Sequence, residues 1–331
     1  MTPSADVPTL AVSGLTTEIP VAGGTVKPVD DVSFEVGRGQ IMGLVGESGS
    51  GKSMTAWSIM GMVDAPGRIS AGRILFQGRD LLSLDERGMR ALRGDRIAMI
   101  FQDPATSLNP VLRIDTQMIE AITAHRSVGR RAARDMAREA LAQVGIASPD
   151  ERLLAYPHQF SGGMRQRVAI AIAMLNRPDL IICDEPTTAL DVTIQSQILA
   201  QMQALCREAG TALVWITHDL SVVAGFADTV AVMYAGRIVE SGTVERVLRQ
   251  PRHPYTHGLI ASVPSHTSNA PRGQPLPQIP GMVPALSALP DGCSFRNRCA
   301  RATEVCRNVP PLEMRDGRQV RCFHPVMEEG A

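Results

Sequence analysis

The sequence predicts an α/β fold built on a largely parallel sheet. Short apolar runs alternate with segments of helical character, and a glycine-rich loop separates one such run from a helix-compatible segment. Short apolar runs are typical of strands that helices cover on both faces. The expected strands are 10–17, 32–36, 41–45, 73–76, 97–101, 180–184, 212–216, 230–234 and 238–240.

Helices are expected between these strands. Residues 54–60 and 81–92 are helix-compatible, and the whole stretch 104–176 has a helical texture. Within it, apolar residues such as Ala133, Ala140 and Val144 recur at helical spacing before Gly145 ends the segment. We interpret 104–176 as a helical insertion in an α/β domain.

Composition excludes several classes of function. The 331 residues include 33 basic and 33 acidic side chains, so the net charge favours neither nucleic acid nor an anionic membrane. Aromatic residues make up 4%, too few for base-stacking platforms to dominate. Residues 1–14 contain no basic segment followed by an apolar stretch, which argues against a secretory signal, and the longest apolar run, 168–175, is too short to span a membrane. We expect a soluble, cytoplasmic chain whose membrane role comes through a partner.

The glycine-rich loop matches the pattern G-x-x-x-x-G-K-[ST] between a buried strand and a helix. Its residues are Gly46, Glu47, Ser48, Gly49, Ser50, Gly51, Lys52 and Ser53. Backbone N–H groups of such a loop point at one anion, and the helix N-terminus adds partial positive charge. The lysine can reach the β- and γ-phosphates, and the serine hydroxyl can ligand Mg²⁺. This predicts a nucleoside triphosphate site.

Polar side chains follow three of the expected strands. Asp184 and Glu185 end the run 180–184, Gln102 follows 97–101, and His218 follows 212–216. Asp184 is suited to hold Mg²⁺, Gln102 to contact Mg²⁺ and the attacking water, and Glu185 to polarise that water. Each alone has an ordinary alternative, such as an acidic turn or a structural histidine. Ligands bind at strand ends in such sheets, which groups these side chains together.

A second anion cradle is predicted at Ser161-Gly162-Gly163, directly before a helix rich in Ala, Ile and Val. The alternative is a simple helix cap with a glycine approach. Taken in this order, the glycine loop, Gln102, the Ser-Gly-Gly motif, the two carboxylates and His218 closely resemble the ATP-binding subunit of an ABC transporter. The fold that this implies is an ABC-type P-loop NTPase, with a RecA-like core, an N-terminal antiparallel β subdomain and a helical insertion.

The resemblance implies a role for each motif. Ser161-Gly162-Gly163 would close on the γ-phosphate held by a partner's glycine loop, and residues 188–191, ending at Asp191, would face the partner ATPase. Glu185 matches the catalytic glutamate, His218 the switch histidine, and Gln102 the glutamine that couples the site to membrane subunits. Ile19 departs from the pattern, because the family places an adenine-stacking aromatic there.

Two further stretches resemble the dipeptide and oligopeptide importers. They are 93–110, beginning Arg93-Gly94-Asp95-Arg96, and 253–259, beginning His253-Pro254-Tyr255-Thr256. The resemblance implies an ATP hydrolase that drives peptide import from the cytoplasmic face of the inner membrane. Its partners would be a second ATPase, two permeases and an extracytoplasmic binding protein. Import of nickel or another small solute is an alternative. A soluble ABC ATPase acting on nucleic acid or ribosomes would show two cassettes or a coiled-coil insertion, and the sequence has neither.

The cysteines fall into two groups. Cys183 and Cys206 are expected to be small core residues. The other four, Cys293, Cys299, Cys306 and Cys322, are spaced C-x5-C-x6-C-x15-C, a cluster that favours metal ligation over disulfides in a cytoplasmic chain. The resemblance implies a [4Fe–4S] cluster. A Cys₄ zinc site and free thiols are the alternatives, because short C-x-x-C pairs are absent.

The chain is expected to divide into two parts. Residues 1–260 would form the ABC ATPase domain, and 261–331 a Pro-rich linker with an irregular, Cys-rich C-terminal extension. Proline is frequent from 264 onwards, and no periodic element of useful length is evident there.

Overall fold

The computed structural model describes residues 7–103, 107–187, 191–263 and 277–327. Their contacts divide the chain into two compact units. The first unit comprises 1–10, 36–41 and 76–215, and the second comprises 11–35, 42–75 and 216–331.

The first unit contains part of a parallel sheet. Strands β6 (Ile97–Ile100) and β7 (Leu180–Asp184) pair in parallel, with Ile97 opposite Leu180 and Ile100 opposite Cys183. Strand β8 (Ala212–Thr217) follows β7 in the strand order β8-β7-β6. All of β7 and β8 is buried, which explains why these strands read as uninterrupted apolar runs. Cys183 is buried in β7, as predicted.

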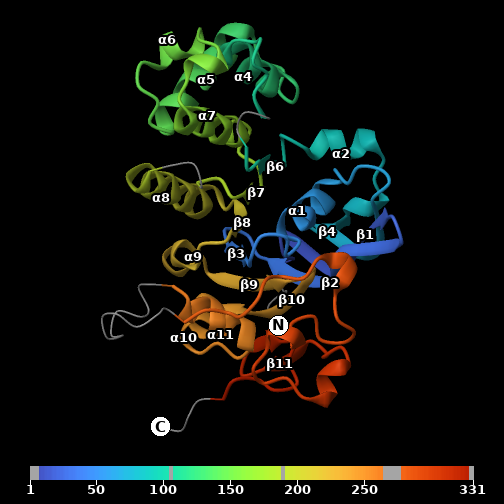
Figure 1. Cartoon of the computed structure of the whole chain (residues 1–331). Helices are drawn as coiled ribbons and strands as arrows, with labels where there is room; N and C mark the ends of the chain where they lie inside the picture. The colour runs from blue at the N-terminus through green and yellow to red at the C-terminus, as the bar shows by residue number, and fades with distance from the viewer. Residues whose placement is uncertain (1–6, 104–106, 188–190, 264–276, 328–331) are drawn as a thin grey trace, which may run out of the picture. The chain divides into compact units, whose positions relative to one another are not determined.

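Helices make up most of the rest of this unit, and Figure 1 shows α4 to α7 gathered together in green. Their bounds are α4 (Ile114–Thr123), α5 (Arg130–Gln143), α6 (Pro149–Leu153), the short 3-10 helix η2 (Pro157–Gln159) and α7 (Gly162–Met174). The predicted periodicity is confirmed in α5, which buries Ala133, Ala137 and Ala140 and packs against α4 and α7. Helix α8 (Val192–Ala209) buries Cys206, also as predicted.

The segment 79–92 differs from the single helix that the sequence suggested. It forms β5 (Arg79–Asp80), a 3-10 turn η1 (Leu81–Ser83) and then α2 (Glu86–Leu92). Asp80 caps the first turn by accepting the Leu82 N–H, and Asp85 caps α2 by accepting the Gly88 N–H. Two aspartate N-caps within six residues thus start two separate helical turns in place of one helix.

The second unit has its own stretch of sheet, in the order β11-β12-β10-β9-β3. Strand β3 (Ile41–Val45) pairs in parallel with β9 (Thr229–Tyr234), and β9 pairs antiparallel with β10 (Arg237–Thr243). The helices of this unit are α1 (Lys52–Met60), α9 (Leu220–Phe226), α10 (Val244–Arg249) and α11 (Pro254–Ala261). Gly43 admits close packing here, because an added Cβ would lie 2.7 Å from Val223.

A further sheet of this unit has the order β2-β1-β4. Its strands are β1 (Leu10–Val21), β2 (Gly24–Val36) and β4 (Arg68–Phe76). All are longer than predicted, because the added residues are largely exposed or half-buried and their apolar members do not alternate regularly.

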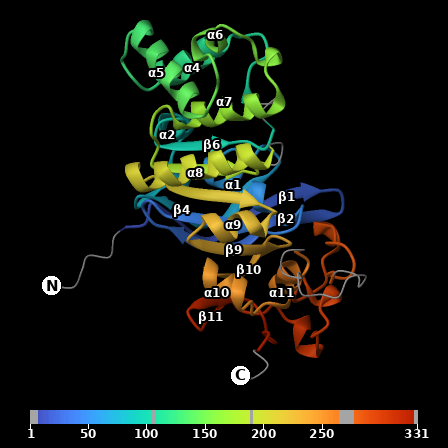
Figure 2. The same ribbon diagram turned by 90° about the vertical axis from the view of Figure 1, so that its left-hand side faces the viewer.

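The C-terminal segment, residues 277–327, corrects one prediction. It contains the 3-10 turns η4 (Leu286–Ala288), η5 (Arg296–Arg298) and η6 (Glu304–Arg307), then β11 (Glu313–Arg315) and β12 (Arg318–Val320). The expectation of an irregular appendage is wrong for these strands, since β12 pairs antiparallel with β10. Each strand has three residues, two of them polar, which leaves no apolar alternation to detect. Figure 2 shows the segment, orange to red, beside α10, α11 and β10.

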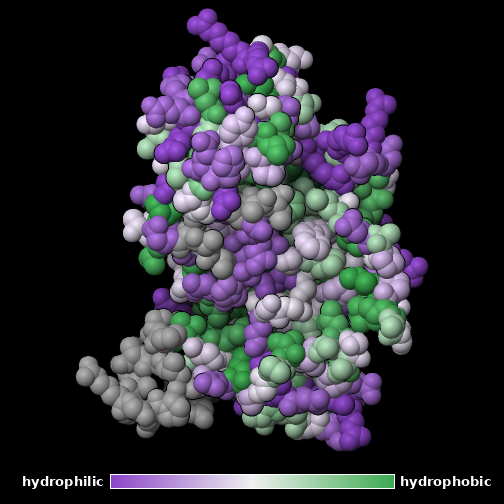
Figure 3. All heavy atoms as spheres, turned by 45° about the horizontal axis from the view of Figure 1, so that its top comes forward, coloured by the Kyte–Doolittle hydropathy of each residue, from purple (hydrophilic) through white to green (hydrophobic). Residues whose placement is uncertain are grey.

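Among the described residues, no helix combines the length and apolar character needed to cross a membrane. On the face drawn in Figure 3, apolar side chains form separate patches among polar ones.

Candidate functional site

The predicted phosphate loop, residues 46–53, connects β3 to α1 in the second unit. Gly46 and Gly51 have φ angles of 155° and 104°. A Cβ at Gly46 would lie 2.2 Å from the Met233 carbonyl oxygen, and one at Gly51 would lie 2.0 Å from that of Pro28. Only glycine fits at these two positions, because both the backbone angle and the neighbouring carbonyl exclude a side chain.

Lys52 is the first residue of α1, and 5% of it is exposed. Its ammonium donates to the carbonyl oxygens of Gly46 at 2.9 Å and Glu47 at 3.0 Å. The loop therefore curls around a cation at a helix N-terminus, which is a local environment that attracts anions. Ser53 is half-buried beside it on the first turn of the helix.

Glu47 is anchored by residues that the sequence reasoning missed. Its backbone N–H donates to the Tyr255 hydroxyl at 2.9 Å, and its carboxylate accepts two bonds from Arg298, at 2.7 and 3.1 Å. The hydrogen bond to Glu47 raises the pKa of Arg298 above its ordinary value, and burial raises that of Tyr255. From the sequence, the stretch beginning at His253 indicates only the importer family, and no pattern pairs Arg298 with the loop.

In the first unit, two predicted residues come together at the ends of β6 and β7. Gln102 Nε2 donates to Glu185 Oε2 at 3.4 Å. Neighbouring parallel strands end at the same edge of a sheet, which is why residues 83 positions apart meet. Asp184 is buried, and Glu185 has a φ of 48°, an uncommon angle for a residue with a side chain. Such backbone strain concentrates at functional sites.

The other predicted positions lie at helix N-termini or after a strand. The Ser161 hydroxyl accepts the Met164 N–H at 3.3 Å and so caps α7, whose first residues are Gly162 and Gly163. Asp191 caps α8 in the same way. His218 follows β8 and is exposed. Residues 188–190, predicted to face a partner ATPase, lie outside the described residues.

The four C-terminal cysteines influence one another electrostatically. Burial raises the pKa of Cys293, Cys299 and Cys322, the last to about 11, and neighbouring thiols raise each of them further. The Cys293 N–H also donates to the Cys306 carbonyl at 3.0 Å. Nevertheless, no group of three or more His, Cys, Asp or Glu side chains within the described residues is arranged to hold a metal ion.

Comparisons with known proteins cover nearly the whole chain. The family model "ABC transporter" matches residues 29–188, and "Oligopeptide/dipeptide transporter, C-terminal region" matches 239–306. The oligopeptide transport ATP-binding protein OppD of Salmonella typhimurium is 48% identical over 320 residues, which cover 96% of this chain and 94% of OppD.

The chain belongs to the ABC transporter ATP-binding protein family. The dipeptide transport ATP-binding protein DppD of Haemophilus influenzae is 47% identical to this ABC ATP-binding protein over 305 residues, 92% of each chain. Among solved structures, the dimeric ATP-binding cassette MJ0796 bound to ADP and Pi has a TM-score of 0.66 at 24% identity. The match covers 71% of this chain and 98% of MJ0796, and it shows the fold.

One prediction about this ABC ATP-binding protein concerns the adenine contact. Ile19 is half-buried in β1 and lies close to Gly67, where an added Cβ would be 3.5 Å from Ile19 Cγ1. An aliphatic side chain thus stands at the position where the resemblance expects an aromatic one.

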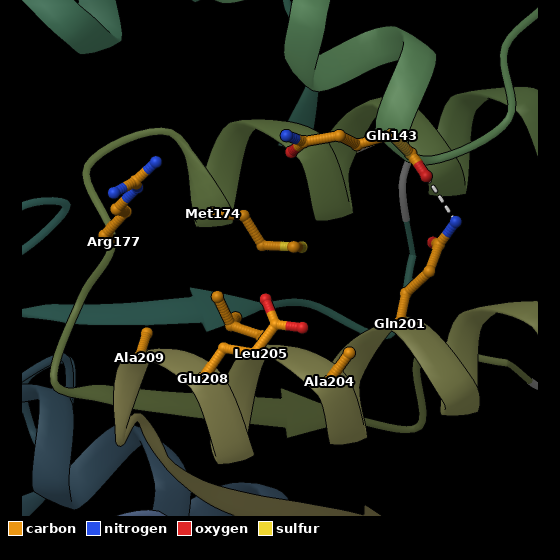
Figure 4. A pocket seen from close by; sticks show the side chains of 8 residues that line it. All are labelled: Gln143, Met174, Arg177, Gln201, Ala204, Leu205, Glu208 and Ala209. Atoms are coloured by element: carbon orange, nitrogen blue, oxygen red, sulfur yellow. Dashed lines mark hydrogen bonds between the residues drawn. The ribbon is translucent and has the colours of Figure 1, made fainter.

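A pocket of about 440 Å³ lies in the first unit, between the C-terminal ends of α5 and α7 and helix α8 (Figure 4). Gln201 Nε2 donates to the Gln143 carbonyl across its mouth. Apolar Met174 and Leu205 and charged Arg177 and Glu208 are among the residues that line it. None of the residues predicted for nucleotide binding lines this pocket.

Proposed function

We propose that this ABC ATPase hydrolyses ATP to drive the import of dipeptides or oligopeptides. The observation that carries the ATPase part is the phosphate loop with buried Lys52 at the start of α1. The peptide part is supported by whole-length similarity to proteins named for oligopeptide and dipeptide transport, together with the match to their C-terminal region.

Residues of the phosphate loop would hold the phosphates of ATP. Their N–H groups supply hydrogen bonds and Lys52 supplies charge. Mg²⁺ would be held by oxygen ligands from Ser53, Asp184 and Gln102, and oxygen donors are the kind that this ion prefers. When bound, Mg²⁺ neutralises charge on the phosphates.

Glu185 would accept the proton of the attacking water, with Gln102 orienting its carboxylate. The 3.4 Å contact between these side chains supports that pairing. His218 would contact the γ-phosphate. In a second copy of the site, Ser161, Gly162, Gly163 and Asp191 would face ATP held by a partner subunit.

The assembly proposed is a heterodimer of this chain with a second ATPase, beneath two permeases at the cytoplasmic face of the membrane. An extracytoplasmic binding protein would deliver the solute. The dimeric form of the similar cassette MJ0796 supports a paired ATPase. We propose that 1–260 form the ATPase domain, with 104–176 as its helical subdomain, and that 261–331 form an appended region.

The four C-terminal cysteines are proposed to bind a [4Fe–4S] cluster, with Zn²⁺ as the alternative. Four thiols are a donor set that suits either. As described, the sulfurs do not form a metal-holding group, so binding would require them to converge further. Protein purified without oxygen should absorb at about 400 nm if it holds the cluster. A colourless protein with stoichiometric zinc would exclude it.

The experiment that tests the ATPase proposal compares two variants. Lys52→Ala should lose ATP binding, whereas Glu185→Gln should keep binding but lose about 10²- to 10⁴-fold in hydrolysis. Glu313→Gln, the same change at an exposed residue of β11, is the control and should behave like the wild type. Normal hydrolysis by Glu185→Gln would refute its role as base.

The solute is tested after reconstitution with the permeases and the binding protein. Short peptides should stimulate hydrolysis and nickel should not. Stimulation by nickel alone would refute the peptide assignment and leave the ATPase assignment standing.

A further inference from the structure

Arg298 links the C-terminal segment to the phosphate loop. It belongs to η5, between Cys293 and Cys299, and only 6% of its side chain is exposed. The two terminal nitrogens of its guanidinium bond to the two carboxylate oxygens of Glu47, at 2.7 and 3.1 Å. Two parallel, charge-assisted hydrogen bonds fix direction as well as distance, so this contact holds Glu47 in one orientation.

The guanidinium is itself held in place. Arg298 Nε donates to the Pro280 carbonyl at 2.9 Å, and Nη2 donates to that of Gly281 at 3.2 Å. Its carbon Cζ lies 5.8 Å from the ring centre of Tyr234 and 5.9 Å from that of Phe295. An ion pair sheltered by aromatic rings is less screened by water than a surface pair.

Every polar group of Glu47 is therefore occupied. Tyr255 accepts its N–H, Arg298 binds its carboxylate, and its carbonyl accepts Lys52 Nζ at 3.0 Å and the Ser50 N–H at 3.2 Å. The contacts with Tyr255, Arg298 and Ser50 determine where this second residue of the loop lies. The contact with Lys52 connects it to the phosphate-binding lysine. Two of the anchors come from outside the loop, more than 200 positions along the chain.

We propose that Arg298 is a positioning residue for ATP binding: through Glu47 it holds the phosphate loop in the shape that accepts the nucleotide. The proposal rests on the assignment of residues 46–53 as the phosphate loop. Arg298 does not touch the nucleotide in this scheme. It raises the fraction of molecules in which the loop is ready to bind, and the apparent dissociation constant varies inversely with that fraction.

The test measures ATP binding to the full chain by calorimetry. Arg298→Gln and Glu47→Gln should each raise the dissociation constant by about tenfold, and the double variant should be no worse than either alone. Arg298→Lys keeps the charge but not the paired geometry, so it should recover part of the affinity. Arg307→Gln breaks an exposed ion pair with Glu304 in the same segment and should bind ATP normally.

A second measurement separates positioning from general destabilisation. Hydrogen exchange at the amides of the phosphate loop should accelerate in Glu47→Gln, while exchange in β10 and β12 stays unchanged. Because Glu47 lies outside the C-terminal segment, this variant tests the proposal even if Arg298→Gln fails to fold.

The results that would overturn the proposal are specific. They are a change in ATP affinity below about twofold in Glu47→Gln, or effects of the two single variants that multiply in the double variant. Lys52→Ala separates failure of the loop assignment from failure of the positioning role. If Lys52→Ala binds ATP normally, the loop assignment fails; if it does not bind while Arg298→Gln binds ATP with the affinity of the wild type, only the positioning role fails.

Discussion

Replacing Arg318 by methionine would break a buried ion pair that fastens the C-terminal segment to β10. The side chains of Arg318 and Glu240 are 2% and 0% exposed, with Nη1 3.8 Å from Oε1. Arg318 Nη1 also donates to the carbonyls of Arg246, at 2.7 Å, and Gln250. Methionine fills similar space but supplies neither the charge nor the donors.

The expected loss of stability follows from the contacts that Glu240 would keep and the one it would lose. Glu240 would keep hydrogen bonds from the N–H groups of Arg252 and His253, at 2.8 and 2.9 Å, but lose its cation. Removing one partner of a buried pair costs about 3–5 kcal/mol, because the other charge stays buried and uncompensated. Burial already raises the pKa of Glu240, so the cost should shrink in acid, where the carboxyl can become neutral.

The assay is hydrogen exchange across the β10–β12 pairing, where Glu240 lies opposite Val320. The amide hydrogens that exchange when β10 and β12 separate should exchange about 100-fold faster or more in Arg318→Met than in the wild type. Arg315→Met is the matched control, because the Arg315–Glu313 pair is 38% and 48% exposed and should contribute about 0–1 kcal/mol. Equal effects of the two variants would refute the reasoning.

Two further predictions concern the second unit. Burial lowers the pKa of His253 from 6.5 to about 3 in the folded protein, so acid protonates the unfolded chain first. Stability present above pH 6.5 should fall by about 2 kcal/mol by pH 5, measured by urea unfolding. His253→Asn keeps an acceptor for the Tyr255 N–H and should flatten this pH dependence; an unchanged slope would contradict the assignment. Gly51→Ala should abolish ATP binding in calorimetry, because its Cβ would meet a backbone carbonyl. Gly49→Ala, with nothing within 4 Å of its Cβ, should weaken ATP binding by no more than the backbone strain it introduces, about 1–2 kcal/mol. Equal losses of ATP binding in the two variants would contradict the steric argument.

The sequence identified the strands that lie in the interior of the sheet. β3 and β7 have the predicted bounds, because a strand buried on both faces must be apolar throughout and contrasts with the polar residues around it. The contact of Gln102 with Glu185 also follows from sequence, since both come directly after neighbouring parallel strands.

Other features could not be predicted, for a different physical reason. β11 and β12 are stabilised by pairing with a distant strand, and their own residues show no periodicity. The contact between Arg298 and Glu47 joins residues 251 positions apart. An arginine near cysteines and a glutamate in a glycine loop have no local pattern in common, so only the folded chain brings them into one site.

The hairpin of β11 and β12 also determines which strand lies at the edge of the sheet. A chain cut before Glu313 would retain the region matched by the C-terminal family model yet leave one side of β10 without a partner. Unpaired N–H and C=O groups along a strand invite pairing with other chains. With the hairpin present, the outermost strand is instead β11, which is short and carries Glu313 and Arg315. β11 and β12 thus protect β10 from pairing with other chains. Versions of the protein that end before Glu313 are expected to self-associate.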